Sequence, residues 1–264
     1  MKKLVNRPGW DAQASFYIGR IEFKNKQYET ALTWFDKVTQ GPYEYDSSVA
    51  AVSVLLSQKN FSEAEQRLVK MVAKFPKHKL NILLLKAEIY SEQKQYQKAF
   101  DILTEELVNS PEHRDLLYTR ALIAEKVDRL DILETDLKKI LIKKPNDAAV
   151  LNALGYTLVD RTERYDEAGE YLQRALKISP EEAVIMDSMG WLRFKQGRLA
   201  EALEILRVAY DKQSENEIAA HLAEVLWVMG DKDEARKVFE KAFKEAPEDE
   251  YLLKFQLRFP EINN

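Results

Sequence analysis

The sequence predicts an all-α protein, a solenoid of about seven helix-turn-helix repeats that ends in a capping helix. The composition favours helix, because 45% of the 264 residues are apolar, 32% are charged, and the chain holds only eight glycines and eight prolines. Small residues recur at a spacing of 33 to 35 residues, and a second small position and a closing proline follow in the same phase. A fixed period of this length is typical of stacked helical hairpins, which cannot bury their apolar faces alone.

The first recurring small residue is expected where the two helices of each hairpin cross, because a side chain of about one carbon lets the backbones approach closely. A second small residue is expected to do the same against the next repeat. Proline then ends the second helix, since it lacks an amide donor and clashes with the preceding turn. The first column is Gly19, Val52, Ala87, Ala121, Gly155, Gly190 and Ala223. The second is Ala31, Ala64, Ala99, Leu133, Ala168, Ala202 and Ala235. The closing prolines are Pro76, Pro111, Pro145, Pro180 and Pro247, with Pro42 one position early and Ser214 in place of a proline.

These columns divide the chain into an N-terminal segment, seven repeats and a cap. Residues 1–11 are expected to be the remnant of an earlier element, which implies a longer parent chain. In the fifth repeat the helices are expected over Ala148–Asp160 and Asp166–Ile178, with one extra residue between them. Residues 248–264 form the cap and tail, with a capping helix over Asp249–Phe259 that stops at Pro260. The seven repeats are expected at 12–44, 45–79, 80–113, 114–147, 148–182, 183–215 and 216–247.

The repeated stretches carry a family resemblance. LNALGYTL, YDEAGEYLQRALKISP and DEARKVFEKAFKEAP, at a period of about 34 residues, resemble the tetratricopeptide repeat. The resemblance covers about residues 12–247. It implies a right-handed superhelix in which the first helix of each repeat lines the concave face and the second lies outside.

A narrower resemblance covers residues 115–247. LLYTRALIAEKVDRLDILETDLKKIL, DAAVLNALGYTLVD and DSMGWLRFKQGRLAEAL are similar to the C-terminal repeats of a proteobacterial tetratricopeptide family. Many members are exported lipoproteins on the outer membrane, and at least one is an adaptor that binds and activates a carboxyl-terminal processing protease in the periplasm. The resemblance implies a location on the periplasmic side of the outer membrane. This sequence has no cysteine for a lipid anchor, so the resemblance implies that it is part of a longer lipoprotein that carries the anchor. A cytoplasmic location is the alternative.

Catalytic and metal motifs do not stand out in the sequence. His78, His113 and His221 lie in separate repeats without zinc-site spacing, and the chain has no cysteine. The stretch DSMG at 187–190 lacks the first glycine of a nucleophile elbow and falls within a predicted helix. A net charge of −4 argues against a nucleic-acid binder, and no apolar run reaches the length of a membrane span. We therefore expect no enzymatic activity, no cofactor and no metal site.

The expected functional surface is the inner face of the first helices, whose residues follow from helical periodicity. In the first and third repeats this face presents Phe16, Arg20, Phe23, Lys24, Leu84, Glu88 and Glu92. In repeats four to seven it sets aromatic side chains among carboxylates, which favours binding of neutral or basic protein segments. The expected anchors are Tyr156, Trp191, Phe194 and Trp227, and the alternative is that some of them pack against the outer helices. The full candidate partner-binding set is Tyr118, Asn152, Tyr156, Asp160, Asp187, Trp191, Phe194, Glu217, His221, Glu224 and Trp227.

Two classes of function remain open. The first is a non-catalytic adaptor that docks a protein or peptide partner, with a carboxyl-terminal processing protease as the partner that the narrower resemblance implies. The second is structural: a spacer that self-assembles through the repeat ends, or a regulatory repeat region of a larger protein.

Overall fold

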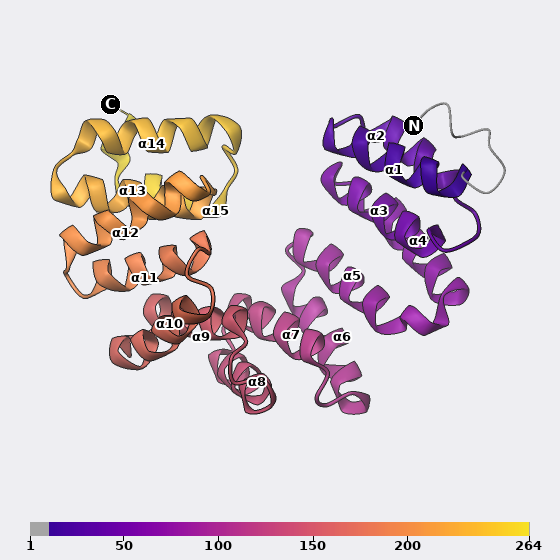
Figure 1. The fold of residues 1–264 in the computed structure, drawn as a ribbon, viewed down its shortest axis with the longest axis horizontal. Coiled ribbons are helices and arrows are strands. Elements are labelled where there is room, and N and C mark those ends of the chain that lie inside the picture. Colours follow the sequence, from indigo (N-terminus) through magenta and orange to yellow (C-terminus); the bar gives the residue numbers. More distant parts are fainter. Residues whose placement is uncertain (1–10, 264) are drawn as a thin grey trace. The chain divides into compact units, whose positions relative to one another are not determined.

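The computed structural model describes residues 11–263 (Figure 1). These residues form 15 α-helices and two short 3-10 segments, and they contain no β-strand. The all-α fold class is therefore confirmed. The expected remnant at residues 1–11 lies outside the described residues, except for Asp11, which begins the first helix.

The chain divides into two compact units, Met1–Leu130 and Asp131–Asn264. In the first unit, α1 packs on α2, α3 on α4 and α5 on α6, and each hairpin contacts the helix that follows it. The first helices also meet directly, α1 with α3 and α5 with α7. The helices of this unit are α1 (Asp11–Lys24), α2 (Tyr28–Asp36), α3 (Glu44–Ser57), α4 (Phe61–Lys74), α5 (Lys79–Glu92), α6 (Tyr96–Asn109) and α7 (Arg114–Lys126).

The second unit repeats this arrangement. The hairpins are α9 with α10, α11 with α12 and α13 with α14, and the first helices form a continuous row in which α9 contacts α11, α11 contacts α13, and α13 contacts α15. The helices are α8 (Leu130–Lys143), α9 (Ala148–Arg161), α10 (Tyr165–Ile178), α11 (Ala183–Lys195), α12 (Leu199–Lys212), α13 (Asn216–Met229), α14 (Lys232–Glu245) and α15 (Glu250–Arg258).

The recurring glycines lie where the two helices of a hairpin cross, as expected. A Cβ atom on Gly155 would lie 2.7 Å from Cγ of Leu172, and one on Gly190 would lie 2.6 Å from Cγ of Leu206. Gly19 meets the Phe35 ring in the same way, at 2.6 Å. Real Cβ atoms do not approach other atoms so closely, so these three positions exclude every larger residue unless a neighbour moves.

The second small column needs a correction in the fifth hairpin. Ala168 is fully buried. A Cβ atom on Gly155 would lie 3.2 Å from the carbonyl oxygen of Ala168, so Ala168 lies at the crossing of the two helices of its own hairpin. The next residue, Gly169, faces the following repeat, where a Cβ would lie 3.5 Å from Leu192. The close approach between these two repeats therefore involves Gly169.

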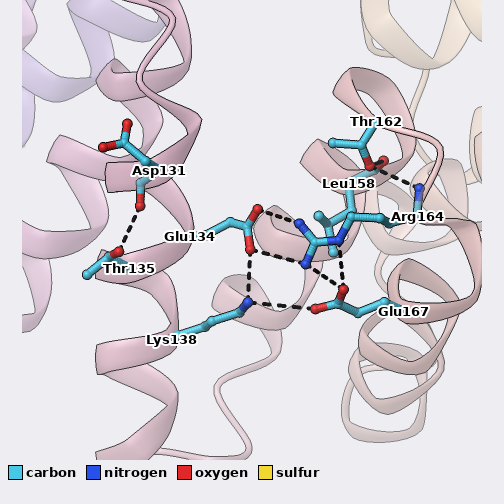
Figure 2. Close-up of polar contacts among 8 residues, drawn as sticks. All are labelled: Asp131, Glu134, Thr135, Lys138, Leu158, Thr162, Arg164 and Glu167. Carbon is cyan, nitrogen blue, oxygen red and sulfur yellow. Dashed lines mark hydrogen bonds and ion pairs between the residues drawn. The ribbon is translucent and has the colours of Figure 1, made fainter.

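The turns between paired helices show how the fifth hairpin accommodates its extra residue. Six hairpins place a residue in the left-handed region at this turn: Lys26, Lys59, Lys94, Asp128, Gly197 and Gly230, with φ from 55° to 91°. In the fifth hairpin Thr162 is extended instead, with φ −144°. Its hydroxyl donates to the Leu158 carbonyl (2.6 Å) and accepts from the Arg164 amide (3.1 Å), as Figure 2 shows. One threonine thus joins the end of α9 to the start of α10.

Ion pairs connect the second helices of neighbouring hairpins near the same turn. The Arg164 guanidinium donates to Glu134 of α8 (2.6 Å) and to Glu167 of α10, and Lys138 donates to Glu134 (2.9 Å; Figure 2). These carboxylates raise the pKa of Arg164, and Arg164 together with Lys138 lowers the pKa of Glu134 against the effect of burial. All four side chains are partly exposed, so the network adds only modest stability.

The capping helix is present where it was expected. The Asp249 carboxylate accepts hydrogen bonds from the Tyr251 and Leu252 amides and so caps α15. Leu252 and Phe255 are buried with Phe239 of α14 in one apolar cluster. No helix among residues 11–263 combines the length and apolarity needed to cross a membrane.

Candidate functional site

The first unit has a groove of about 1130 Å³ on the face formed by its first helices. Apolar and aromatic side chains from α1, α3 and α5 form most of its wall. The lining residues are Phe16, Tyr17, Arg20, Ile21, Phe23, Lys24, Tyr45, Asp46, Val49, Ala50, Ser53, Asn81, Leu84, Leu85, Glu88 and Thr119.

The groove confirms the register used to select inner-face residues in the first and third repeats. Six of the seven residues expected there, among them Phe16, Arg20 and Leu84, line the groove, whereas Glu92 does not. Tyr45 and Val49 of the second repeat were missed. Val49 stands three residues before the small-column residue Val52, as Phe16 and Leu84 do in their repeats, so the same register applied to the second repeat would have found it.

The charges of this groove are separated along its wall. Arg20 and Lys24 come from α1, whereas Asp46 comes from α3 and Glu88 from α5. The Arg20 guanidinium lies 5.8 Å from the centre of the Phe16 ring. Desolvation by the surrounding side chains raises the pKa of Glu88, and the nearby Glu92 carboxylate raises it further. The groove thus has a cationic side and an anionic side with apolar surface between them.

The second unit brings most of the remaining candidates together as a buried polar cluster. Nδ1 of His221 on α13 lies 3.0 Å from each carboxylate oxygen of Asp187 on α11. The Trp191 ring stacks on the His221 ring, with centroids 4.0 Å apart and planes 14° apart. The Tyr156 ring, on α9, also lies near His221, with ring centroids 6.1 Å apart. Asp187, Trp191 and His221 are all buried.

Glu217 lies one turn before His221 and joins this cluster. The Tyr156 and Tyr251 side chains lie close to Glu217, whose Oε1 atom is buried without a hydrogen-bond partner. Burial raises the pKa of Glu217. Burial alone would lower the pKa of His221, but the Asp187 carboxylate, with Glu217, raises it above its ordinary value. Burial and the nearby carboxylates also raise the pKa of Tyr156.

Further candidates surround this cluster. The Trp191 indole donates to Asp160 (3.3 Å), which is exposed, and Phe194 stacks on Trp191 with ring centroids 4.9 Å apart. Asn152 lies one turn before Tyr156 on α9, and its buried Oδ1 atom has no hydrogen-bond partner. Tyr118 belongs to the first unit, on α7, where the Arg114 guanidinium lies 5.2 Å from its ring.

Glu224 and Trp227 are placed apart from that cluster, near the cap. Glu224 is buried and forms an ion pair with Arg258 of α15. The Trp227 ring lies 6.0 Å from the Phe259 ring, and the Lys232 ammonium lies 4.9 Å from its centre. These contacts join α13 to α15 and α14.

Trp191 and Trp227, two of the four expected anchors, are buried, which favours the alternative that they pack against neighbouring helices. Their side chains are only 3% and 6% exposed, whereas Tyr156 and Phe194 are half-buried. Helical periodicity predicts the face of the helix on which these side chains lie, but not whether side chains of the next repeat cover them. In the second unit the rings of Trp191 and His221, on adjacent first helices, stack on one another and fill the face. In the first unit the smaller residues Ser53 and Ala50 at the equivalent positions leave it open.

Comparison with known proteins identifies the family of this fold. Two family models described as tetratricopeptide repeat match residues 146–215 and 193–257. A third, described as anaphase-promoting complex, cyclosome, subunit 3, matches residues 24–106. This chain is a tetratricopeptide repeat protein.

Curated relatives carry the same description. The chain is 39% identical over 211 residues to a TPR repeat-containing protein of Pseudomonas aeruginosa, which covers 80% of this chain and 36% of the relative. It is 32% identical over 114 residues to a TPR repeat-containing protein of Methanocaldococcus jannaschii, covering 43% of this chain and 20% of the relative. The tetratricopeptide chain thus spans about a third or less of the length of these relatives.

Solved structures support the fold. A tetratricopeptide repeat protein from Parabacteroides merdae aligns with a TM-score of 0.71 at 17% identity, over 94% of this chain and 98% of that one. A chain of the APC/C hetero-tetramer Cut9–Hcn1 aligns with a TM-score of 0.68 at 14% identity, over 99% of this chain and 53% of that one. At such identities the likeness concerns the helical-repeat fold alone.

Proposed function

We propose that this tetratricopeptide protein is a non-catalytic scaffold that docks a segment of a partner protein in the groove of its first unit. The observation that carries this proposal is the groove itself, about 1130 Å³ in volume and lined mainly by apolar and aromatic side chains of three successive first helices. Aromatic and apolar anchors of this kind supply most of the free energy of protein–protein binding. Tetratricopeptide repeats in general act as protein-interaction scaffolds.

The charges of the groove define the partner segment further. Arg20 and Lys24 on α1 favour a carboxylate at one end of the segment, and Asp46 and Glu88 favour a basic residue at the other. Between them the segment presents apolar side chains to Val49 and Leu84. In the second unit, this proposal keeps a partner-binding role for three of the half-buried or exposed candidates, Tyr156, Asp160 and Phe194.

The identity of the partner rests on the narrower family resemblance. We propose a carboxyl-terminal processing protease, met on the periplasmic side of the outer membrane by a longer lipoprotein of which this sequence is part. The support is the similarity of residues 115–247 to repeats of an adaptor family.

Titration calorimetry with the purified protease of the same genome tests this proposal. Leu84→Asp places a charge in the groove wall and should weaken binding at least tenfold. The matched control is Val108→Asp on α6, because Val108 is 79% exposed and lies outside the groove. Equal binding by both variants would place the docking surface elsewhere, and no binding by the unaltered chain would remove this protease as the partner.

A structural role is the second candidate, and one observation favours it. Leu253 and Leu257 lie one turn apart on the capping helix and are 42% and 82% exposed. An apolar strip on a terminal helix is suited to contact between repeat ends. Light scattering of the chain and of a Leu257→Asp variant decides this point: self-assembly through the cap predicts an oligomer that the substitution dissociates.

A further inference from the structure

The cluster of Asp187, Glu217 and His221 has a charge imbalance that the fold does not correct. Asp187 and His221 are buried, and Glu217 is half-buried. Within residues 11–263 neither carboxylate is paired with a lysine or an arginine, and the one cationic group in contact with Asp187 is His221. Even with His221 protonated, two carboxylates face one positive charge. Charges in such places are paired or bind metal ions.

The geometry of the three groups fits a metal ion. One possible ligand atom from each residue lies within 4.8 Å of the other two. Tetrahedral zinc, with bonds of about 2.0–2.2 Å to nitrogen and oxygen, separates neighbouring ligand atoms by about 3.3 Å. Nδ1 of His221 is 3.0 Å from each Asp187 oxygen. To replace the proton between these two side chains by an ion, the nitrogen and the carboxylate oxygen need to move apart by only a few tenths of an ångström.

The surroundings hold these groups in place. The Tyr156 and Tyr251 side chains lie close to Glu217, and the Glu217 Oε1 atom is buried and has no hydrogen-bond partner. The Trp191 ring stacked on His221 restricts rotation of the imidazole. Partners that orient a ligand side chain are typical of metal sites, whose affinity depends on them. Glu217 thus offers one oxygen atom with no other acceptor role.

We propose that Asp187, Glu217 and His221 form a binding site for a divalent transition-metal ion, for which zinc is the probe. The ion replaces the proton on His221 Nδ1 and neutralises the two carboxylates. It thereby links α11 to α13, which belong to successive repeats. The proposal is independent of the groove in the first unit and of any partner.

The sequence did not reveal this site, because its spacing matches no zinc motif. Asp187 and His221 are 34 residues apart, one repeat period, and only stacking of the repeats brings them together. Glu217 and His221 are four residues apart on one helix, which is the sole local signal.

The test uses chain prepared without a histidine tag, stripped with a chelator and titrated with zinc chloride by calorimetry. One zinc ion per chain is expected. Asp187→Asn, Glu217→Gln and His221→Gln should each weaken binding at least tenfold, since even partners that only orient ligands contribute about 10- to 100-fold. The matched control replaces the other two histidines of the chain, His78→Gln with His113→Gln, and should bind zinc as the unaltered chain does.

Three results would overturn the proposal: no stoichiometric zinc, undiminished binding by His221→Gln, or loss of binding in the control. X-ray absorption of the zinc-loaded unaltered chain gives a second measurement that needs no variant. Because the chain has no cysteine and only three histidines, the site predicts one imidazole nitrogen with oxygen ligands. A spectrum with two or more imidazoles, or with none, would contradict it even if a substituted chain failed to fold.

Discussion

His221 Nδ1 lies 3.0 Å from both carboxylate oxygens of Asp187, a residue 34 positions earlier on the neighbouring first helix. This contact joins the sixth and seventh hairpins through buried polar atoms. It replaces, at this point of the second unit, the open apolar surface that the equivalent helices of the first unit present. The first helices of the two units therefore present different kinds of surface.

The stability of the metal-free chain should fall as the pH rises above about 6.5. The pKa of His221 is raised from 6.5 in the folded chain, so its contribution is complete below that value and is lost as the pH rises through the folded pKa. The pKa of Glu217 is raised from 4.5, so its ionisation destabilises the fold in the same direction. Thermal unfolding in the presence of a chelator measures the effect.

His221→Gln supplies the comparison for this pH dependence. It should flatten the slope of the melting temperature between pH 6.5 and 8, whereas His78→Gln should leave the slope unchanged. A melting temperature that rises over this interval in the unaltered chain would contradict a raised pKa of His221 in the folded state.

Gly155→Ala should destabilise the chain by about 1–3 kcal/mol, because the new Cβ would lie 2.7 Å from Leu172 in a crossing without free space. Gly169→Ala is the matched control on the facing helix. There a Cβ meets Leu192 at an ordinary 3.5 Å, so the better helix propensity of alanine should stabilise by about 0.5–1 kcal/mol. Urea unfolding of the two variants should give opposite signs, and equal signs would contradict the packing role of Gly155.

Thr162→Val should cost about 1 kcal/mol, because valine keeps the shape of threonine but cannot join the Leu158 carbonyl to the Arg164 amide. Thr135→Val provides the control within the same unit (Figure 2). The Thr135 hydroxyl donates to the Asp131 carbonyl on an exposed helix surface, so its loss should change stability by less than about 0.5 kcal/mol. Chemical denaturation distinguishes the two, and similar effects would show that the turn does not depend on the hydroxyl.

Trp191→Ala and Trp227→Ala should each lower stability by about 3–5 kcal/mol, as removal of a large buried ring does. Val108→Ala, at a side chain that is 79% exposed, should change it by less than about 0.5 kcal/mol. Loss of partner binding in a tryptophan variant would therefore report unfolding of the second unit. A normal melting temperature in both tryptophan variants would restore them as candidate anchors.

The sequence was sufficient for the fold because the repeat period constrains every hairpin at once. Gly19, Gly155 and Gly190 keep one phase, and each lies at a crossing where a larger side chain does not fit. The cap was equally predictable, since its apolar residues can only be buried against the preceding hairpin. The turn at Thr162 was not, because a local hydroxyl bridge leaves no periodic signal.

The site was predictable only in part. Helical register gives the direction in which a side chain leaves its helix, and that placed Phe16 and Leu84 correctly in the groove. Exposure depends on what the next repeat contributes, and Trp191 is covered because His221 is positioned to stack on it. That pairing involves residues about 30 positions apart and follows from packing rather than from the pattern of either helix.

Site-specific photo-crosslinking in the native cell tests the central claim, docking in the first-unit groove, most directly. A photoreactive amino acid replaces Val49 in the groove, and in a second strain it replaces the exposed Val108 outside the groove. We predict a crosslinked adduct with one partner protein from position 49 and none from position 108, with the partner identified by mass spectrometry. Adducts of equal yield from both positions, or adducts only between copies of this chain, would contradict the proposed docking groove.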